Sequence, residues 1–190
     1  MLNIAHRGFK SSYPENTMLA LNKAIEAGAC GIEFDIHLTK DGHLVIIHDE
    51  NLKRTCGVDV FVKDLSLEEL KTYDASYHYE DYEEKISTLR EYFDYAKDLD
   101  IITNIEIKNG IYFYENIEEK LYELIKEFNM EDKIIISSFN HKSILKMKEI
   151  DQSLELAFLE ESILADPVGY VKENGIKNYH PIAQTMNMIY

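Results

Sequence analysis

Short apolar runs alternate with segments of helical periodicity along most of this 190-residue chain. The apolar runs have the length and composition of buried strands, and the segments between them repeat their apolar residues at helical spacing. This alternation predicts an α/β fold with a parallel sheet. The predicted strands cover residues 2–5, 31–38, 44–48, 101–108, 134–139, 154–159 and 179–182.

Capping signals mark where the predicted helices begin and end. Asn16 or Thr17 can cap a first helix, and Thr88 with Glu91 opens another. Further helices are predicted over 117–128, over 142–150 and from Asp166 to Gly175. Because the strand–helix alternation lacks a glycine-rich phosphate loop, it favours a TIM-type (β/α) barrel, whose functional residues lie at the C-terminal ends of several strands.

The stretch 51–86 interrupts this alternation. It contains a strand-like run at 58–62, a capping box that starts at Ser66, and several tyrosines. We interpret it as a small insertion after the strand that ends at His48. The chain is then a single barrel domain, residues 1–190, that carries this insertion.

Composition and charge exclude several classes of partner. The net charge of −15 lacks the basic surface that nucleic acids and anionic membranes require. Cys30 and Cys56 have no metal-site or disulfide spacing and indicate reduced thiols. The sequence shows neither a signal peptide nor an apolar run long enough to cross a bilayer. We therefore predict a soluble, cytoplasmic protein that binds no nucleic acid and does not insert into membranes.

Two carboxylates share one face of the strand 31–38. Glu33 and Asp35 are two residues apart, so their side chains project together toward the predicted barrel interior, while Phe34 faces the helices. Two unpaired carboxylates there would be costly, since desolvation and mutual repulsion both oppose ionisation. A bound divalent cation, Mg²⁺ or Ca²⁺, would offset this cost.

The strand 101–108 repeats the arrangement with Asn104, Glu106 and Lys108. Glu106 can supply a third carboxylate, and Lys108 can offset charge or bind a phosphate oxygen. The alternative is that these are surface residues of edge strands that form ion pairs. The recurrence of the pattern on two strands, flanked by two histidines, favours a metal site.

His6 and His48 each follow an apolar strand, and Arg7 is next to His6. A single histidine there is usually structural, but two beside a carboxylate cluster suggest a general acid and a general base. The Arg7 guanidinium can contact two phosphate oxygens, or it can form a surface salt bridge. Asp49 either orients His48 or caps the strand.

These motifs together resemble the N-terminal signature of bacterial glycerophosphodiester phosphodiesterases. The resemblance covers the chain in order from Leu2 to about Ile182, and the compound motif is highly specific. The segments that carry it are His6-Arg7-Gly8, Pro14-Glu15-Asn16-Thr17, Gly31-Ile32-Glu33-Phe34-Asp35, Leu38-Thr39-Lys40-Asp41-Gly42, His48-Asp49, Asn104-Ile105-Glu106-Ile107-Lys108 and Ile136-Ser137-Ser138-Phe139.

The resemblance implies a TIM-type barrel and metal-dependent hydrolysis of glycerophosphodiesters to glycerol 3-phosphate and an alcohol. It also implies that the insertion 51–86 shapes the pocket for the alcohol. Which histidine is the acid, and whether a cyclic phosphate forms on the way, stay open. The residue roles that it implies are an acid–base pair at His6 and His48, metal ligands at Glu33, Asp35 and Glu106, and phosphate contacts at Arg7 and Lys108.

One departure from the family concerns the end of the barrel. Family members continue with further strands, one of which contains tryptophan, whereas this sequence has no Trp and its last residues, 183–190, resemble the start of a helix. We therefore expect a barrel without its closing strands, which would expose strand edges. The alternatives left open are a homodimer that completes the barrel, a truncated inactive remnant that only binds phosphodiesters, and a related lyase acting on phospholipid head groups.

Overall fold

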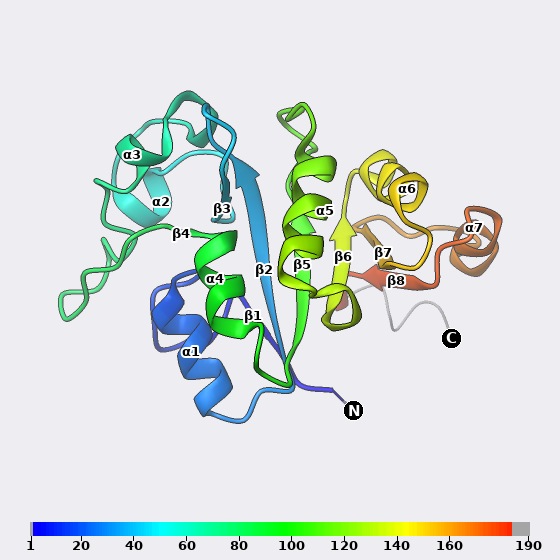
Figure 1. Cartoon of the computed structure of the whole chain (residues 1–190), viewed down its shortest axis with the longest axis horizontal. Helices are drawn as coiled ribbons and strands as arrows, with labels where there is room; N and C mark the ends of the chain where they lie inside the picture. The colour runs from blue at the N-terminus through cyan, green and yellow to red at the C-terminus, as the bar shows by residue number, and fades with distance from the viewer. Residues whose placement is uncertain (1, 184–190) are drawn as a thin grey trace.

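The computed structural model describes residues 2–183 and contains one eight-stranded sheet with helices packed along it (Figure 1). The strands are β1 (Ile4–His6), β2 (Gly31–Leu38), β3 (Leu44–Ile46), β4 (Ser87–Thr88), β5 (Ile102–Ile107), β6 (Ile134–Ser138), β7 (Glu155–Glu160) and β8 (Asn178–Pro181). The α-helices are α1 (Met18–Glu26), α2 (Lys53–Cys56), α3 (Leu67–Leu70), α4 (Leu89–Ala96), α5 (Ile117–Phe128), α6 (His141–Ile150) and α7 (Pro167–Glu173), and short 3-10 helices cover Val62–Asp64 and Glu131–Lys133.

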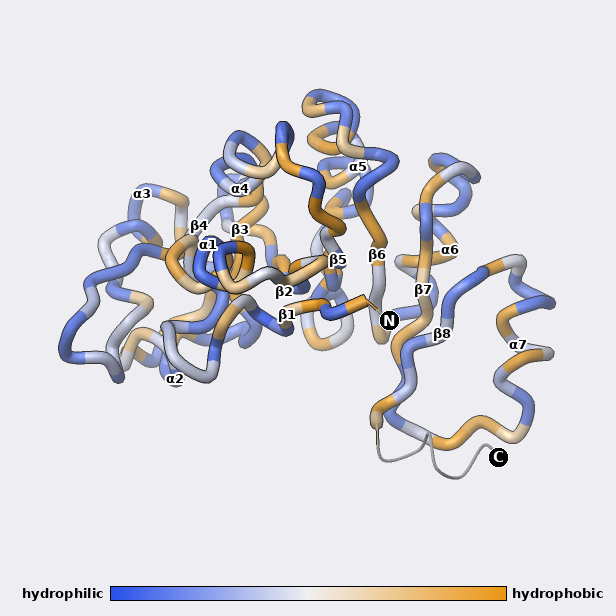
Figure 2. The backbone as a smooth tube through the Cα atoms, turned by 90° about the horizontal axis from the view of Figure 1, so that it is seen from below, coloured by the Kyte–Doolittle hydropathy of each residue, from blue (hydrophilic) through white to orange (hydrophobic). Residues whose placement is uncertain are grey.

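Strands β1, β2, β5, β6, β7 and β8 pair in parallel, and helices connect them in the predicted alternation. Helices α4, α5 and α6 lie on one side of the curved row of strands (Figure 2). This arrangement confirms the TIM-type (β/α) fold class. Within residues 2–183, β1 pairs only with β2 and β8 pairs only with β7, so hydrogen bonding does not close the ring.

The expected parallel arrangement does not extend to β3 and β4, which pair antiparallel to their neighbours. The connection 39–43 between β2 and β3 is too short to hold a crossover helix, so it forms a hairpin. The unpredicted strand β4 then adds to β3. Its last residue, Thr88, also caps α4 through the predicted capping box with Glu91.

Most predicted strand boundaries shift by one or two residues, and the strand-like run at 58–62 forms no strand. The first strand ends at His6, and β3 ends at Ile46, so His48 lies in the following loop. Within the run 58–62, Val62 is fully buried in the apolar cluster of the segment 51–86, and Val58 and Val60 pack against that cluster. Only an isolated bridge from Asn51 to Phe61 and a 3-10 turn remain there.

The main core lies between the outer face of the sheet and the helices. Alternate residues of β2, among them Phe34 and Ile36, are fully buried in it. Phe34 meets the ring of Tyr92 from α4 at 4.8 Å between centroids, and the Tyr92 hydroxyl bonds to Thr103 on β5. The core therefore fixes β2 and β5 side by side and leaves their opposite faces to polar residues.

The segment 51–86 packs around a second apolar cluster. Val45 and Ile47 contribute to it from β3 and the loop after β3, while Leu52, Leu70 and Ile86 come from the segment itself. This packing attaches the segment to the strand that leads to His48. The division into one barrel domain with an insertion stays a prediction.

No helix of the described part of the chain is both long and apolar enough to cross a membrane. The helix start predicted at 183–190 lies, apart from Ala183, outside the described residues. A cytoplasmic location stays a prediction.

Candidate active site

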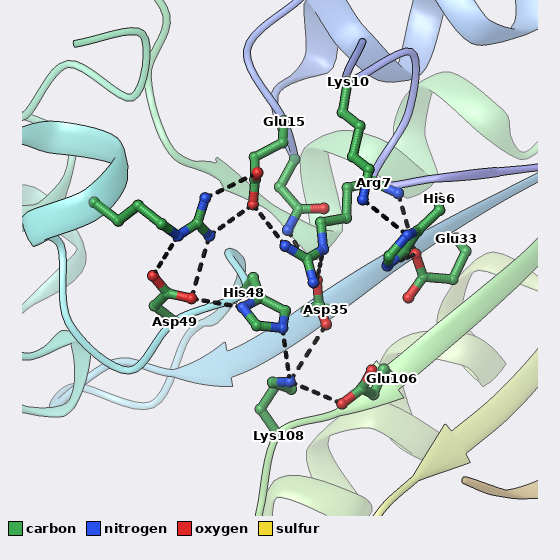
Figure 3. Close-up of polar contacts among 12 residues, drawn as sticks. His6, Arg7, Lys10, Glu15, Glu33, Asp35, His48, Asp49, Glu106 and Lys108 are labelled. Atoms are coloured by element: carbon green, nitrogen blue, oxygen red, sulfur yellow. Dashed lines mark hydrogen bonds and ion pairs between the residues drawn. The ribbon is translucent and has the colours of Figure 1, made fainter. Parts of the chain in front are cut away.

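Sheet register brings three carboxylates together on the face of the sheet opposite the main core. Asp35 on β2 is the direct Cα partner of Glu106 on β5, and Glu33 is one pleat earlier on β2. One oxygen from each of these three residues lies within 4.8 Å of the others (Figure 3). We call Glu33, Asp35 and Glu106 the carboxylate cluster. The strand alternation predicted Glu33 and Asp35 as one pair, and the pairing of β2 with β5 adds Glu106.

Burial and repulsion raise the pKa values of two members of the carboxylate cluster, Glu33 and Glu106. Burial, followed by the charges of Asp35 and Glu106, raises the pKa of Glu33 well above 4.5. Burial and Asp35 also raise the pKa of Glu106, although Lys108 opposes this. These are the shifts expected of buried like charges that share a site.

The chemistry of the carboxylate cluster fits a divalent cation. One oxygen of Asp35, Oδ2, accepts a hydrogen bond of 3.0 Å from Asn16. The other, Oδ1, is buried and has no hydrogen-bond partner within residues 2–183, with the Lys108 ammonium 3.7 Å away. A buried carboxylate oxygen without a donor, beside two further carboxylates, offers the hard oxygen ligands that Mg²⁺ and Ca²⁺ prefer.

The loop after β1 places Arg7 over the carboxylate cluster. Arg7 has a φ of 58°, in the left-handed region, and Gly8 follows with a φ of 76°. A Cβ on Gly8 would lie 2.6 Å from the backbone carbon of Ala20, so only glycine allows this close approach to α1. The Arg7 guanidinium lies 3.0 Å from Glu15 Oε1 and 3.5 Å from Asp35 Oδ2. The strained backbone therefore aims the arginine at the cluster.

His6, the last residue of β1, borders the cluster and is 57% exposed. Its Nδ1 accepts a hydrogen bond of 2.9 Å from the Lys10 ammonium, and its Nε2 lies 3.7 Å from Glu33 Oε2. Burial, followed by the charges of Lys10 and Arg7, lowers the pKa of His6. His6 therefore presents Nε2 to the cluster.

His48 approaches the cluster from the loop after β3. Its Nδ1 is 2.5 Å from Asp49 Oδ1, and its Nε2 is 3.2 Å from the Lys108 ammonium. Since an ammonium can only donate, Nε2 is the acceptor and Nδ1 donates to Asp49. The structure thus brings Asp49 into contact with His48, as the first of its two predicted roles requires.

Lys108 connects His48 to the carboxylate cluster. Its ammonium lies 2.9 Å from Glu106 and 3.7 Å from Asp35, in addition to its contact with His48. Burial alone would lower the pKa of Lys108, but the charges of Glu106 and Asp35 outweigh it and raise the pKa. All seven predicted site residues therefore form one continuous set of contacts.

Several contacts around the site were not predicted. Lys10 holds His6, and His37 bonds through its two ring nitrogens to the Tyr114 hydroxyl and the His48 carbonyl. Arg54, in α2, bonds to both Asp49 and Glu15. A charged residue in a short, exposed helix gives no sequence signal for such a role. Glu15 also accepts a hydrogen bond of 3.0 Å from Arg7.

The comparisons with known proteins agree on one family. Residues 6–184 match the glycerophosphoryl diester phosphodiesterase family. A glycerophosphodiester phosphodiesterase from Caldanaerobacter subterraneus is 49% identical over 168 residues, which are 87% of this chain and 69% of that protein.

Solved structures give the same result. A glycerophosphodiester phosphodiesterase from Thermotoga maritima superposes with a TM-score of 0.82 at 32% identity, covering 100% of this chain and 77% of the other. A phosphodiesterase from Oleispira antarctica, solved with the product sn-glycerol-3-phosphate, gives a TM-score of 0.85 at 29% identity, covering 95% of this chain and 74% of the other. The chain belongs to the glycerophosphoryl diester phosphodiesterase family.

Proposed function

We propose that this chain hydrolyses glycerophosphodiesters to glycerol 3-phosphate and an alcohol with a divalent cation held by the carboxylate cluster. The observation that carries the proposal is the convergence of two histidines, two cations and three carboxylates within one contact network. Family membership and the glycerol 3-phosphate bound by the Oleispira relative support the substrate class.

The charges of the site support the cation. Glu33, Asp35 and Glu106 together outnumber Arg7 and Lys108 by one negative charge when all five are ionised. A bound phosphodiester adds a second negative charge. A single Mg²⁺ or Ca²⁺ would balance both, and when bound it would supply the Lewis acid that polarises the phosphoryl group.

The protein's own residues would orient the diester and move its protons. Arg7 can donate its fork of N–H groups to phosphate oxygens, and Lys108 can neutralise charge beside Glu106. His6 and His48 both present Nε2 to the cluster, because Lys10 and Asp49 engage the Nδ1 atoms. One Nε2 would accept the proton of the attacking group, and the other would protonate the leaving alcohol. The attacking group is either water, which gives glycerol 3-phosphate directly, or a glycerol hydroxyl, in which case water then opens the cyclic phosphate.

We place the alcohol next to the segment 51–86. A pocket of about 360 Å³ lies between this segment and the loop after β1, lined by residues that include Glu15, Arg54 and Tyr79. Since Glu15 contacts Arg7, a phosphate held by Arg7 would have its leaving group near this pocket.

The test is turnover of glycerophosphocholine and glycerophosphoethanolamine by the purified chain with Mg²⁺ or Ca²⁺, with and without chelator. We expect release of glycerol 3-phosphate that stops on chelation and in His6→Ala. A cyclic glycerophosphate as the final product would favour the lyase, and metal binding without turnover would favour the inactive remnant. Activity that survives both chelation and His6→Ala would overturn the proposal. Size measurement of the active species decides whether a homodimer is required.

A further inference from the structure

Arg54 joins two carboxylates that belong to different loops. Its Nε and NH2 atoms donate to Asp49 at 2.7 and 3.2 Å, and its NH1 and NH2 atoms donate to Glu15 at 2.9 and 2.8 Å. Forked contacts of this kind fix distance and orientation together, which a single ammonium cannot do. We call Glu15, Asp49 and Arg54 the Arg54 bridge.

Each carboxylate of the Arg54 bridge also holds a residue of the proposed site. Glu15 Oε1 accepts a second hydrogen bond of 3.0 Å from Arg7 NH1. Asp49 Oδ1 accepts the hydrogen bond from Nδ1 of His48. The Arg54 guanidinium is thus separated by a single carboxylate from Arg7, the proposed phosphate contact, and by another from His48 of the proposed acid–base pair.

The backbone of Arg54 is fixed from the far side. His78 Nε2 donates to the Arg54 carbonyl at 2.7 Å, and Tyr77 N donates to the neighbouring Thr55 carbonyl at 3.3 Å. Gly57 ends α2 with a φ of 74°. The segment 51–86 therefore holds the arginine in place against the two loops.

The charges of the Arg54 bridge explain why the guanidinium matters. Burial alone would raise the pKa of Asp49, but hydrogen bonds from Arg54 and His48 outweigh it and lower the pKa to about 2. Burial likewise opposes ionisation of Glu15, and Arg54 followed by Arg7 lowers its pKa. Without Arg54, two nearby carboxylates would repel one another, and both loops would lose their common anchor.

We propose that Arg54 is a positioning residue that aligns His48 and Arg7 at the same time, through Asp49 and Glu15. The proposal rests on the proposed function for the roles of His48 and Arg7. It assigns the segment 51–86 a part in the chemistry beyond shaping a pocket. The expected signature is a fall in kcat through His48 together with a rise in KM through Arg7.

The test compares Arg54→Gln and Arg54→Lys with the control Lys53→Gln. Lys53 is the neighbouring cation in α2, 74% exposed, and its ion pair is with Asp59 at 3.7 Å. We expect Arg54→Gln to lower kcat by about 10- to 100-fold, as for residues that orient a functional side chain from behind. We expect the kcat of Arg54→Lys to lie between those of the wild type and Arg54→Gln, because lysine keeps the positive charge but lacks the forked donors of arginine. Cation affinity should stay at the wild-type value in all three variants.

A double-mutant cycle shows whether the effect passes through Asp49. If Arg54 acts on His48 through Asp49, Arg54→Gln should lower kcat much less in the Asp49→Asn variant than in the wild type. Full additivity of the two losses, or an Arg54→Gln variant with kcat and KM within about twofold of Lys53→Gln, would overturn the proposal.

A spectroscopic readout separates this proposal from the proposed function. NMR of the His48 ring reports the proton on Nδ1 that donates to Asp49, whether or not the chain turns over any diester. A changed Nδ1–H resonance in both Arg54 variants, with none in Lys53→Gln, supports the positioning role even if the wild type proves inactive. An unchanged resonance in the folded Arg54→Lys variant would refute it.

Discussion

The two parts of the site are built in different ways. The carboxylate cluster stands on β2 and β5, which pair in register from Gly31 with Ile102 to Ile36 with Ile107. Arg7 and His48 lie in loops, and side-chain contacts to Glu15 and Asp49 hold them. The sheet fixes the first group through its backbone, whereas a network of charged side chains fixes the second.

This difference predicts how each part responds to substitution. The backbone hydrogen bonds between β2 and β5 persist when a carboxylate of the cluster is substituted. The substitution should therefore change only the local charge and the binding of the cation. A substitution in the side-chain network around Arg7 and His48 removes contacts that hold the neighbouring side chains in place. Its effect should therefore extend to those neighbours. The following experiments test this contrast.

Asp35→Asn should have the largest effect of any single substitution. It keeps the shape and the hydrogen-bond site for Asn16 but removes the most buried charge of the carboxylate cluster. We expect cation binding to be lost and turnover to fall by at least about 10⁴-fold, since a catalytic cation supplies several kcal/mol. Titration calorimetry with Mg²⁺ and Ca²⁺, beside initial rates, measures both.

The matched control for that substitution is Asp132→Asn, at an exposed position of the 3-10 helix before β6. It should change neither cation binding nor turnover. Retention of wild-type cation affinity in Asp35→Asn would show that the carboxylate cluster is not the cation site.

His48→Ala comes next, and it should separate the two parts of the site. Loss of a general acid or base lowers kcat by about 10³-fold. Cation affinity should stay near the wild-type value, because within residues 2–183 the His48 side chain reaches the carboxylate cluster only through Lys108. Steady-state kinetics and calorimetry on the same preparation test this separation. A large loss of cation affinity would mean that the loop and the sheet form a single binding unit.

In the metal-free protein, the carboxylate cluster should make the free energy of unfolding depend on pH. The pKa of Glu33 is raised in the folded chain, mainly by burial, so the folded state holds a proton that the unfolded state releases above about pH 4.5. Unfolding free energy must then fall as pH rises above that value. Glu33→Gln should flatten this slope and raise the metal-free thermal midpoint at neutral pH by roughly 3 °C.

Thermal melts with chelator from about pH 5 to about pH 8 test the sign of this effect. Added Mg²⁺ or Ca²⁺ should raise the thermal midpoint of the wild type but not that of the Glu33→Gln variant. A wild-type midpoint that rises with pH over this range would contradict the proposed repulsion within the carboxylate cluster.

The sequence predicts the sheet-borne part of the molecule well because a strand has a fixed period. Alternation places Glu33 and Asp35 on one face and Phe34 on the other, and the parallel strands and most helix caps follow from local patterns. The strand-like run at 58–62 forms only the isolated bridge from Asn51 to Phe61, so the β propensity of its valines does not decide its conformation. The antiparallel pairing of β3 follows from the short connection between β2 and β3, and the alternation of strands and helices carries no information about the length of that connection.

The loop-borne part could be predicted only in pieces. Arg7 and His48 follow from motifs next to strand ends, whereas the contacts of Arg54 do not. The bond from Arg54 to Glu15 joins residues 39 positions apart, across a segment without a regular period. Contacts of this kind depend on how α2 packs against the second apolar cluster, which only the folded chain shows.

Arg90→Gln should have the smallest effect on turnover and stability, and it serves as a control for Arg54→Gln. Arg90 is 53% exposed and forms a forked pair with Glu127 that joins α4 to α5, much as Arg54, 44% exposed, joins its two carboxylates. The difference is that neither Arg90 nor Glu127 contacts a residue of the proposed site. Because exposed ion pairs contribute little, we expect turnover to be unchanged and the thermal midpoint to move by less than about 2 °C. A fall in kcat like that of Arg54→Gln would mean that activity responds to any lost surface charge, and the contrast between the two arginines would then carry no information about His48.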